Sequence, residues 1–344
     1  MSSELEADAH SESTLAGFLR RQHVKPKPLP TGTPLNGQVA IITGSNVGLG
    51  LEAARQLLGL GLSHLIMGVR TQSKGDAAAQ GLRKEFPGAT IDVWIVDMES
   101  YDSVRAFASR CEKLSRIDIV LLNAGLIKAS HETQPATGHE LTFQVNYLST
   151  ALLTILLLPI LRAKKLTTAG ARPPVLSVVN SDTAYMAKFE TQGPVFRQFD
   201  DRPKSFDAFQ NYARSKLMLA LFVSKLAESV DRGDVLLQLV NPGMTGGTGL
   251  ARENSWFVAL VTRMIVAVIG RSVEVGATTY VDAVVAKGPE SHGAFLSDWT
   301  IKPYPAVWYK PEGKALTERL WEETMEELNF ARASSVISSL KGHV

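Results

Sequence analysis

The sequence predicts an α/β protein built on a parallel sheet, and three observations support this fold class. Short apolar runs alternate with helical patterns from Gln38 onwards. Each run is apolar almost throughout, as strands buried on both faces are. A glycine-rich turn joins the first run to the first helix. The 344 residues, 45% of them hydrophobic and 20% charged, are enough for one large or two small domains, and we expect one.

The alternation defines at least six strands and the helices between them. The apolar runs are QVAIIT (38–43), HLIMGVR (64–70), IDVWIVD (91–97), IDIVLLN (117–123), PVLSVVNS (174–181) and DVLLQLVN (234–241). The helical patterns are GLGLEAARQLLGLG (48–61), a polar helix ending near Phe86, SYDSVRAFASRCEKL (100–114), ELTFQVNYLSTALLTILLLPILRAK (140–164) and a helix around Tyr212–Glu228. This order is typical of βαβ units.

Residues 1–36 are expected to form an extension, with the folded domain at 37–330 and a tail at 331–344. The chain begins acidic and lacks the basic start and apolar core of a secretory signal, so we expect no export signal here. STLAGFLRRQ (13–22) could form a short amphipathic helix. The proline-rich KPKPLPTGTP (25–34) favours an extended strap over a packed element.

Two strongly apolar runs raise the question of a membrane. ALLTILLLPIL (151–161) is too short to span a bilayer, and Arg263 interrupts WFVALVTRMIVAVIG (256–270). We expect neither to be a transmembrane helix, although the second could touch the surface of an internal membrane.

Composition excludes several classes of function. Lys+Arg 36 against Asp+Glu 34 leaves a formal charge of +2, so no global field favours nucleic acid. The single cysteine, Cys111, excludes an intrachain disulfide and a multi-cysteine metal cluster, and it fits a reducing, cytoplasmic compartment. The seven histidines lack the i,i+4 helical pairing of a zincin site, and we predict no metal.

The turn TGSNVGLG (43–50) has the position and composition of a phosphate-binding loop. Its glycines, Gly44, Gly48 and Gly50, permit a tight turn and close helix packing, while the helix N-terminus offers N–H groups to a pyrophosphate. The spacing is G-x-x-x-G-x-G and not the commoner G-x-G-x-x-G. Asn46 and Leu49 belong to the same loop. A purely structural turn is the alternative.

The ends of the next two strands bear on the choice of nucleotide. HLIMGVR ends on Arg70, where an NAD-binding protein of this architecture would carry an acid, and an arginine fork suits a 2′-phosphate. NADP is therefore favoured over NAD, with Lys74 a second candidate ligand and a solvated strand-end cation the alternative. Asp97 either meets the adenine edge or caps the helix that begins near Ser100.

Six landmarks resemble those of the short-chain dehydrogenase/reductase family. They are TGSNVGLG, NAG at 123–125, Asn146 in FQVNYLS, Ser181 in VVNS, Tyr212 and Lys216 in YARSK, and NPG at 241–243. Their order and register match from about Asn36 to Asn329. Within the family the chain resembles the retinol-dehydrogenase-like branch, and more closely fungal members that often accompany polyketide pathways.

The resemblance implies a Rossmann fold with a doubly wound, seven-stranded parallel sheet and a nicotinamide cofactor. It implies Tyr212 as general acid/base, Lys216 as its electrostatic partner and ribose ligand, Ser181 as polariser of the substrate carbonyl, and Asn146 as holder of a relay water. Thr245 would meet the nicotinamide carboxamide, with Thr248 in reserve. The cofactor-binding candidates are Gly44, Asn46, Gly48, Leu49, Gly50, Arg70, Lys74, Asp97, Asn123, Ala124, Gly125, Tyr212, Lys216 and Thr245.

Two features depart from compact members of the family: the usual paired serines before the site are here Asn180–Ser181, of which only the second is the catalytic position in the family, and the segment before Tyr212 is longer. Thirty residues, 182–211, separate Ser181 from Tyr212, and this phenylalanine-rich insertion is expected to fold over the substrate. Residues 246–272 are expected to form a substrate lid. Packing in the protein core would explain the apolar residues of this segment equally well. The long helices that pair in this family would allow a homodimer unless an extension such as residues 1–36 blocks them.

The tyrosine and lysine are spaced for chemistry. Lys216 follows Tyr212 by one helical turn, on the same face. A positive charge at about 5 Å, with an effective dielectric near 20, stabilises phenolate by about 3 kcal/mol, or roughly two pKa units. Ser181 would donate to the nascent alkoxide, the alternative being a satisfied strand-end hydroxyl. For Asn146 the alternative is structural bonding inside an apolar helix.

We therefore expect an NADPH-dependent reductase, or the reverse alcohol dehydrogenase, acting on a bulky apolar carbonyl compound such as a polyketide-type intermediate. Three alternatives stay open. The fold could serve as a non-catalytic nucleotide sensor, it could catalyse a non-redox cyclisation or isomerisation, or it could oxidise a retinoid, steroid or lipid at a membrane surface.

Overall fold

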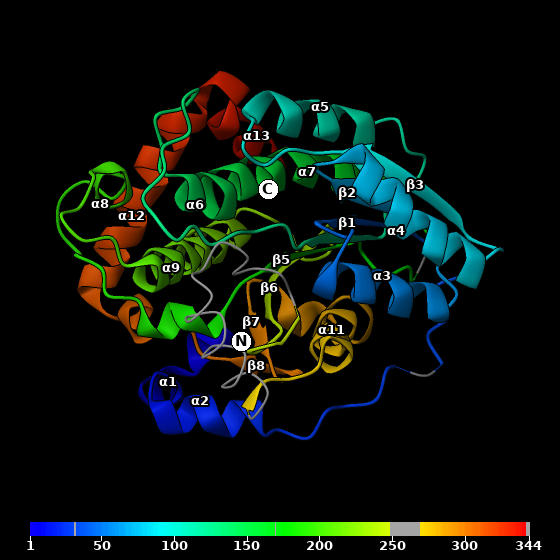
Figure 1. The fold of residues 1–344 in the computed structure, drawn as a ribbon, viewed down its shortest axis with the longest axis horizontal. Coiled ribbons are helices and arrows are strands. Elements are labelled where there is room, and N and C mark those ends of the chain that lie inside the picture. The colour runs from blue at the N-terminus through cyan, green and yellow to red at the C-terminus, as the bar shows by residue number, and fades with distance from the viewer. Residues whose placement is uncertain (31, 169, 248–268, 342–344) are drawn as a thin grey trace.

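The computed structural model describes residues 1–30, 32–168, 170–247 and 269–341. Within these residues the centre of the fold is an eight-stranded sheet of order β3-β2-β1-β4-β5-β6-β7-β8 (Figure 1). Strands β1 to β7 are parallel, and β8 pairs with β7 in the antiparallel direction. The seven-stranded parallel sheet is confirmed, and the eighth strand adds an antiparallel edge that the sequence analysis did not identify.

The six strands identified from apolar runs lie where they were expected, within two residues at each end. The strands are β1 (Val39–Thr43), β2 (His64–Val69), β3 (Thr90–Ile95), β4 (Ile119–Leu122), β5 (Val175–Val179), β6 (Leu236–Asn241), β7 (Phe295–Ser297) and β8 (Thr300–Lys302). The first six are rich in Val, Ile and Leu, residues that pack well on a pleated surface buried on both sides.

Helices cover both faces of the sheet. They are α1 (Glu6–Glu12), α2 (Leu15–Gln22), α3 (Gly48–Gly59), α4 (Gln72–Glu85), α5 (Tyr101–Cys111), α6 (Leu141–Phe143), α7 (Ser149–Lys164), α8 (Arg197–Asp200), α9 (Ala208–Ala227), α11 (Val273–Val281), α12 (Pro311–Glu327) and α13 (Ala333–Leu340). Helices α5, α7, α9, α12 and α13 contribute to the core on one face, and α3, α4 and α11 to the core on the other.

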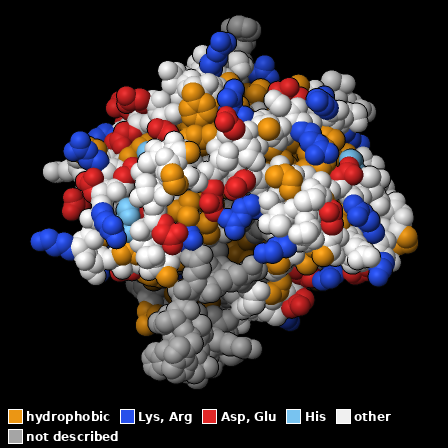
Figure 2. Space-filling model, turned by 45° about the horizontal axis from the view of Figure 1, so that its top comes forward, with side chains coloured by type: hydrophobic (Ala, Val, Ile, Leu, Met, Phe, Trp, Pro, Cys, Tyr) orange, Lys and Arg blue, Asp and Glu red, His pale blue; other side chains and the backbone are white. Residues whose placement is uncertain are grey.

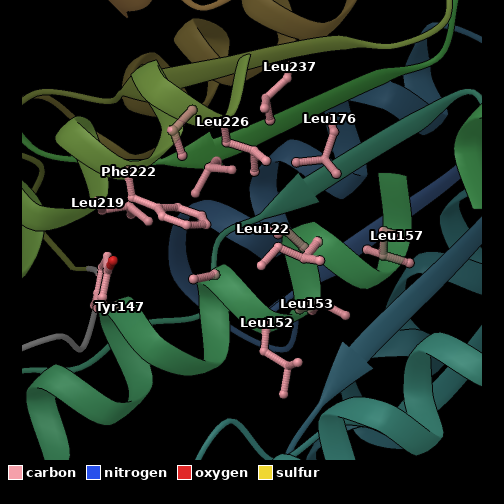
Figure 3. Close-up of a cluster of buried hydrophobic side chains, with 14 of the residues drawn as sticks. Leu122, Tyr147, Leu152, Leu153, Leu157, Leu176, Leu219, Phe222, Leu226 and Leu237 are labelled. Carbon is pink, nitrogen blue, oxygen red and sulfur yellow. The ribbon is translucent and has the colours of Figure 1, made fainter. Parts of the chain in front are cut away.

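The larger core lies between the sheet and the α7/α9 pair, and Figure 3 shows its leucine-rich centre. Leu153 and Leu157 of α7 point towards Leu122 and Leu176 of the sheet. Cys111, at the end of α5, is fully buried in the same core. Burial raises the pKa of its thiol to about 12.

The most apolar helix belongs to this core. Residues Leu141–Lys164 form one continuous helix of 24 residues, which by length and composition could cross a membrane, and 83% of its most apolar window is buried inside the fold. The apolar run at 151–161 is too short to span a bilayer only when it is taken alone. It belongs to the longer helix that the pattern at 140–164 predicted. Its hydrophobic surface is explained by packing against the sheet and α9.

The β7–β8 hairpin closes the sheet with an unusual turn. Its two loop residues, Asp298 and Trp299, both have positive φ, 53° and 60°, as a type I′ hairpin requires. Asparagine and glycine are the usual residues there, so the sequence carried no hairpin signal. The strained backbone is held by burial: Trp299 donates to Thr278 Oγ1 at 3.1 Å, and Asp298 pairs with Arg271 at 2.6 Å.

Residues 1–22 pack on the folded domain. Helices α1 and α2 lie beside β7 and β8 (Figure 1), the backbone N–H of Phe295 donates to the buried Ser2 hydroxyl at 2.8 Å, and Lys302 of β8 pairs with Glu12 at 3.3 Å. The helix expected over residues 13–22 is α2, whereas the expected start of the folded core near Asn36 leaves out this packed segment. Its buried side chains are mostly polar, which is why an apolar pattern did not reveal it.

The C-terminal tail is also part of the core. Residues Ala333, Ile337 and Leu340 of α13 are buried and pack on α7, and Arg162 of α7 donates to the carbonyl of Ser339 at 2.8 Å.

On the surface, lysine and arginine side chains are interspersed with aspartate and glutamate over the face drawn in Figure 2. This mixture agrees with the small formal charge of +2.

Candidate active site

A cleft of about 1400 Å³ runs along the carboxyl ends of the parallel strands. It is lined from the loops that follow β1 to β6, the edge at which ligands bind in open α/β sheets. The volume exceeds the roughly 300–1,000 Å³ of a pocket for one drug-sized ligand. There is accordingly room for a dinucleotide and a second molecule.

The glycine-rich turn forms the floor of one end of this cleft. Gly44 and Gly48 have positive φ, 67° and 57°, which side chains other than glycine rarely adopt. A Cβ on Gly50 would lie 2.6 Å from the side-chain nitrogen of Asn123 and 2.7 Å from the carbonyl oxygen of Gly44. Gly44, together with Asn46 and Leu49, lines the cleft, while Gly48 and Gly50 shape the turn behind it.

Helix α3 begins at Gly48, and its N-cap, Val47, provides no side-chain hydrogen bond. The backbone N–H groups of the first turn therefore need another acceptor. A phosphate in the cleft would supply one, and the partial positive charge of the helix end favours it. The cradle thus fits a pyrophosphate, as the loop spacing predicted.

Asn123, Ala124 and Gly125 line the cleft beside this turn. The Asn123 amide donates to the carbonyls of Thr43 and Gly44 at 3.0 and 3.2 Å. The backbone N–H groups of Asn123 and Ala124 both donate to the Thr43 hydroxyl. Thr43, which the sequence analysis did not single out, therefore joins the loop after β1 to the loop after β4.

Charged residues gather at the ends of β2 and β3. Arg70, Lys74, Asp97 and Glu99 all line the cleft. The Arg70 guanidinium is 63% exposed and forms an ion pair with Glu99, an acid that the sequence analysis missed because it lies in the next loop and not at the end of β2. A 2′-phosphate would have to compete with Glu99 for this arginine.

The structure separates the two roles considered for Asp97. Helix α5 is capped by Ser100, whose hydroxyl accepts a hydrogen bond from the Ser103 backbone N–H at 3.3 Å. Asp97 instead accepts from the backbone N–H of Glu99 at 3.0 Å and faces the cleft. Contact with the adenine edge stays a prediction, whereas capping of α5 does not need Asp97.

Three of the four predicted catalytic residues, Ser181, Tyr212 and Lys216, meet in the cleft. Ser181 follows β5 and accepts from the Thr183 backbone N–H at 3.2 Å. Tyr212 and Lys216 are one turn apart on α9, both buried. The Lys216 ammonium nitrogen lies 5.7 Å from the centre of the Tyr212 ring and donates to the Val179 carbonyl at 2.9 Å.

Burial dominates the electrostatics of this pair. It raises the pKa of Tyr212 to about 12, against a hydrogen bond with Ser181 that lowers the value, and the charge of Asp182 raises it further. Burial also lowers the pKa of Lys216 to about 8. Burial thus places the tyrosine pKa above its ordinary value, where the spacing alone predicted a value below it, because the low dielectric disfavours phenolate and ammonium alike. The phenol stays protonated at neutral pH.

Asn146 lies in η2 (Gln144–Leu148), a π-helical turn between α6 and α7, and such turns are frequent at functional sites. Its side-chain amide donates to the Leu126 carbonyl at 2.9 Å and to the Ser215 hydroxyl at 3.2 Å, and its oxygen accepts from the Leu126 N–H at 2.9 Å. The structural role considered for it is present, since these bonds fasten the loop after β4 to α9. The relay water stays a prediction.

Thr245, in the loop after β6, lines the cleft and donates to the Gly243 carbonyl at 3.1 Å. The reserve candidate Thr248 and most of the expected lid at 246–272 lie outside the described residues, as does nearly all of the run at 256–270 that could touch a membrane. Among the residues that the structure describes, no group of histidine, cysteine, aspartate and glutamate side chains is arranged to hold a metal ion.

The insertion before Tyr212 divides its residues between the cleft and the core. Thr183, Met186 and Phe209 line the cleft. Phe196 and Phe199 instead pack on Phe143 of α6, with ring centres 5.0 and 4.1 Å away. Only part of the insertion thus lines the cleft, because α6 offers Phe196 and Phe199 a buried aromatic surface. Its folding over the substrate stays a prediction.

Helix α2 also reaches the cleft, which the sequence analysis did not foresee. Leu15 and Phe18 are among the lining residues. No local pattern marks this contact, because the helix is held there by partners more than 150 positions away in the chain.

Comparison with known proteins gives this architecture a context. A model of the family described as short chain dehydrogenase matches residues 38–168. The short chain dehydrogenase virL of Hypocrea virens is 60% identical, over 99% of this chain and 99% of its own length. The short chain dehydrogenase/reductase mfmJ of Annulohypoxylon moriforme is 46% identical, over 95% of each. The crystal structure of L-sorbose reductase from Gluconobacter frateurii, complexed with NADPH and L-sorbose, has the same fold, with a TM-score of 0.57 and 20% identity over 77% of this chain and 97% of that one.

Proposed function

The chain belongs to the short-chain dehydrogenase family, and from this premise we propose that it is an NADPH-dependent reductase of bulky apolar ketones, aldehydes or enones, which can also run in reverse as an alcohol dehydrogenase. The observation that carries the proposal is the meeting of Ser181, Tyr212 and Lys216 in one cleft. A protein that only sensed a nucleotide would need the glycine-rich turn but not these three side chains.

The cofactor proposal rests on the end of the cleft around the glycine-rich turn. The cradle at Gly44 and Gly50 and the open first turn of α3 suit a dinucleotide pyrophosphate. Arg70 and Lys74 supply positive charge where a 2′-phosphate would lie. The fold is shared with an L-sorbose reductase solved with NADPH. When bound, the nicotinamide coenzyme supplies the hydride.

In the proposed mechanism Ser181 and Tyr212 act on the substrate oxygen. Ser181 donates a hydrogen bond to the carbonyl, which stabilises the negative charge that develops on that oxygen. Tyr212 gives its phenolic proton to the same oxygen, and its raised pKa keeps that proton in place at neutral pH. A protonated phenol suits the reductive direction.

Lys216 and Asn146 support this proton transfer. The buried Lys216 ammonium lies beside the Tyr212 ring and would stabilise the phenolate left after the transfer. Asn146 holds the loop after β4 against α9, and we propose that its carbonyl oxygen also holds a water that returns a proton towards Lys216.

The substrate class follows from the lining of the cleft near these residues. Met186, Phe209 and Met244 line it there together with Phe18, and such side chains suit an apolar molecule. A polyketide-type carbonyl compound fits this lining and the chain's resemblance to fungal members of the family.

Replacing Tyr212 with Phe tests the mechanism. The change removes the proton donor and keeps the ring, so we expect turnover of NADPH with a panel of apolar ketones and aldehydes to fall about 100- to 10,000-fold. The dissociation constant of NADPH, measured by fluorescence titration, should change less than about threefold, which is under 1 kcal/mol. Full activity in this variant would refute the mechanism.

Tyr147→Phe is the matched control, because it removes a hydroxyl from a buried tyrosine that bonds to Thr324 away from the cleft. Its turnover should equal that of the native protein.

A parallel titration with NADH tests cofactor choice: NADPH should bind about ten- to a hundredfold more tightly than NADH, as expected for one charge-assisted contact. Equal affinities for NADPH and NADH would indicate that Arg70 stays paired with Glu99 and does not bind a 2′-phosphate.

Product mass separates reduction from a cyclisation or isomerisation in the same cleft. A reductase adds two hydrogens and consumes one NADPH for each product molecule, whereas either non-redox reaction leaves both the mass and the NADPH unchanged. Mass spectrometry of the product therefore decides between the two chemistries.

A further inference from the structure

Helix α2 forms part of the cleft wall, although it belongs to the segment before the first strand. Phe18 is only 8% exposed and Leu15 is 73% exposed, and both line the cleft. Thr14 caps the helix by accepting from the Gly17 backbone N–H at 3.0 Å, so the helix start near Leu15 is well defined.

The C-terminal end of α2 is bonded to the loop after β6. The Gln22 side chain donates to the Met244 carbonyl and accepts from the Met244 N–H, both at 3.0 Å. Arg271 donates to the backbone carbonyl of Arg21 at 2.7 Å and to that of Pro242 at 2.9 Å. These bonds fix the helix and the loop to each other.

A buried ion network joins the same helix to the loop after β5. The Arg21 guanidinium, 2% exposed, pairs with Glu12 at 2.5 Å and with Asp182 at 3.4 Å. Asp182 directly follows Ser181. Such a network is costly to bury and is strongly directional, so it holds α2 in one position relative to Ser181.

These partners place α2 at the catalytic end of the cleft. The loops after β5 and β6 carry Ser181 and Thr245, whereas the charged residues Arg70 and Asp97 come from the loops after β2 and β3 at the other side of the sheet. Phe18 therefore faces the part of the cleft where a carbonyl substrate would lie, and not the part that suits the adenosine.

We propose that helix α2 is a wall of the substrate pocket and that Phe18 is a specificity residue that favours flat aromatic carbonyl compounds. The proposal rests on the proposed reductase function, whose substrate class it narrows. Aromatic rings stack in offset or edge-to-face geometry and gain more than their buried area alone. Met186, Phe209 and Met244 supply the remaining apolar contacts.

The test compares a bulky aryl ketone, 2-acetonaphthone, with the small ketone 2-butanone in NADPH-dependent reduction. Phe18→Ala should raise the KM for 2-acetonaphthone about tenfold, the loss expected for removing a large apolar contact. The kcat for 2-acetonaphthone and the KM for 2-butanone should stay within about twofold, because a wall residue contributes binding in the ground state and the transition state alike. Equal effects on both ketones, or none, would overturn the proposal.

Leu19→Ala is the matched control. Leu19 lies on the same helix and is 36% exposed, so its loss should leave both KM values unchanged. Phe18→Leu guards against a folding defect in the alanine variant, since it keeps an apolar side chain in place; it should raise the KM for 2-acetonaphthone less than alanine does. The dissociation constant of NADPH should be equal in the native protein and the three variants, which would show that the coenzyme end of the cleft is intact.

Binding separates this proposal from the reductase function. If the native protein oxidises no NADPH with either ketone or with the panel of apolar ketones and aldehydes, the reductase function fails, and calorimetric titration of 2-acetonaphthone into the protein saturated with NADP⁺ decides the role of α2. A dissociation constant that rises about tenfold in Phe18→Ala and not in Leu19→Ala supports the wall. No binding to the native protein, or equal binding to all variants, overturns it.

Discussion

Arg20 and Arg21 are neighbours that both pair with Glu12, yet their surroundings differ greatly. Arg20 is 60% exposed and Arg21 is 2% exposed. An exposed ion pair contributes about 0–1 kcal/mol, because water and salt screen it. Removal of one partner from a buried pair costs about 3–5 kcal/mol, because a charge is left behind without compensation.

We therefore expect Arg21→Met to lower the free energy of unfolding by about 3–5 kcal/mol and Arg20→Met by less than about 1 kcal/mol. Urea denaturation of the two variants measures both values. Since Glu12 keeps Lys302 as a partner, the larger loss should come from Asp182. A small effect of Arg21→Met would mean that Asp182 takes up a proton instead, and the stability difference would then depend on pH.

At single positions, sequence reasoning worked where the chemistry is local. The glycines of the turn after β1 need only their neighbours to be recognised, and Tyr212 and Lys216 need only one helical turn. Asp97 could not be assigned in this way, because Asp97 and Ser100 are equally good caps and only the fold shows that Ser100 is used. The raised pKa of Tyr212 was not predicted, because its largest cause is burial, which the sequence does not show.

Among the elements, the junction of three segments at His139 carries the clearest pH dependence. His139 pairs with Asp200 of α8 at 2.8 Å and with Glu327 of α12 at 3.3 Å. Burial lowers the pKa of His139, but its hydrogen bond to Asp200 and its ion pair with Glu327 outweigh burial and raise the pKa to about 9. The junction thus fastens the insertion to the C-terminal helix while the imidazole is charged.

The stabilisation from a raised histidine pKa is fully present below pH 6.5 and is lost as the pH rises through about 9. Its size is at most about 3 kcal/mol. We expect the unfolding free energy of the native protein to fall over this interval relative to that of His139→Gln, since both proteins keep the other titrating groups, such as Lys216. His131→Gln is the matched control, because His131 contacts the same insertion through the Phe199 carbonyl and should leave the slope unchanged. A native slope retained in His139→Gln would contradict the assignment.

Elements whose identity depends on distant partners were the ones that sequence reasoning missed. The β7–β8 hairpin has Asp298 and Trp299 at its turn, and contacts with residues outside the hairpin, among them Arg271 and Thr278, hold that turn. Helix α2 was expected, but its place in the cleft depends on Asp182 and Met244, 161 and 222 positions away from their partners Arg21 and Gln22. Likewise Phe196 and Phe199 pack on Phe143 of α6 and do not line the cleft.

For the molecule as a whole, α13 covers part of α7, one of the long helices. The segment expected to block the long helices, residues 1–36, packs beside β7 and β8 at its helical part, whereas α13 covers α7 (Figure 1). Blocking of helix pairing by residues 1–36 stays a prediction, and the C-terminal α13 is a second segment that lies on a long helix.

Ending the chain after Arg332 should expose this face of α7. Loss of the buried Ile337 and Leu340 should remove about 1.5–3 kcal/mol of stability for each side chain. The bared apolar surface should cause concentration-dependent association, which sedimentation velocity measures. A chain ending after Leu340 keeps α13 and should sediment as the native protein does. If both truncated chains sediment alike, α13 has no part in controlling association.

The burial of Cys111 has a practical consequence for all of these experiments. With its only thiol enclosed in the core and its pKa raised, the native chain should be almost inert towards maleimide reagents at neutral pH. A cysteine introduced on the exposed side of α2 or α13 would be the single reactive group, so one fluorophore could be attached there to follow each helix in solution without altering any other position.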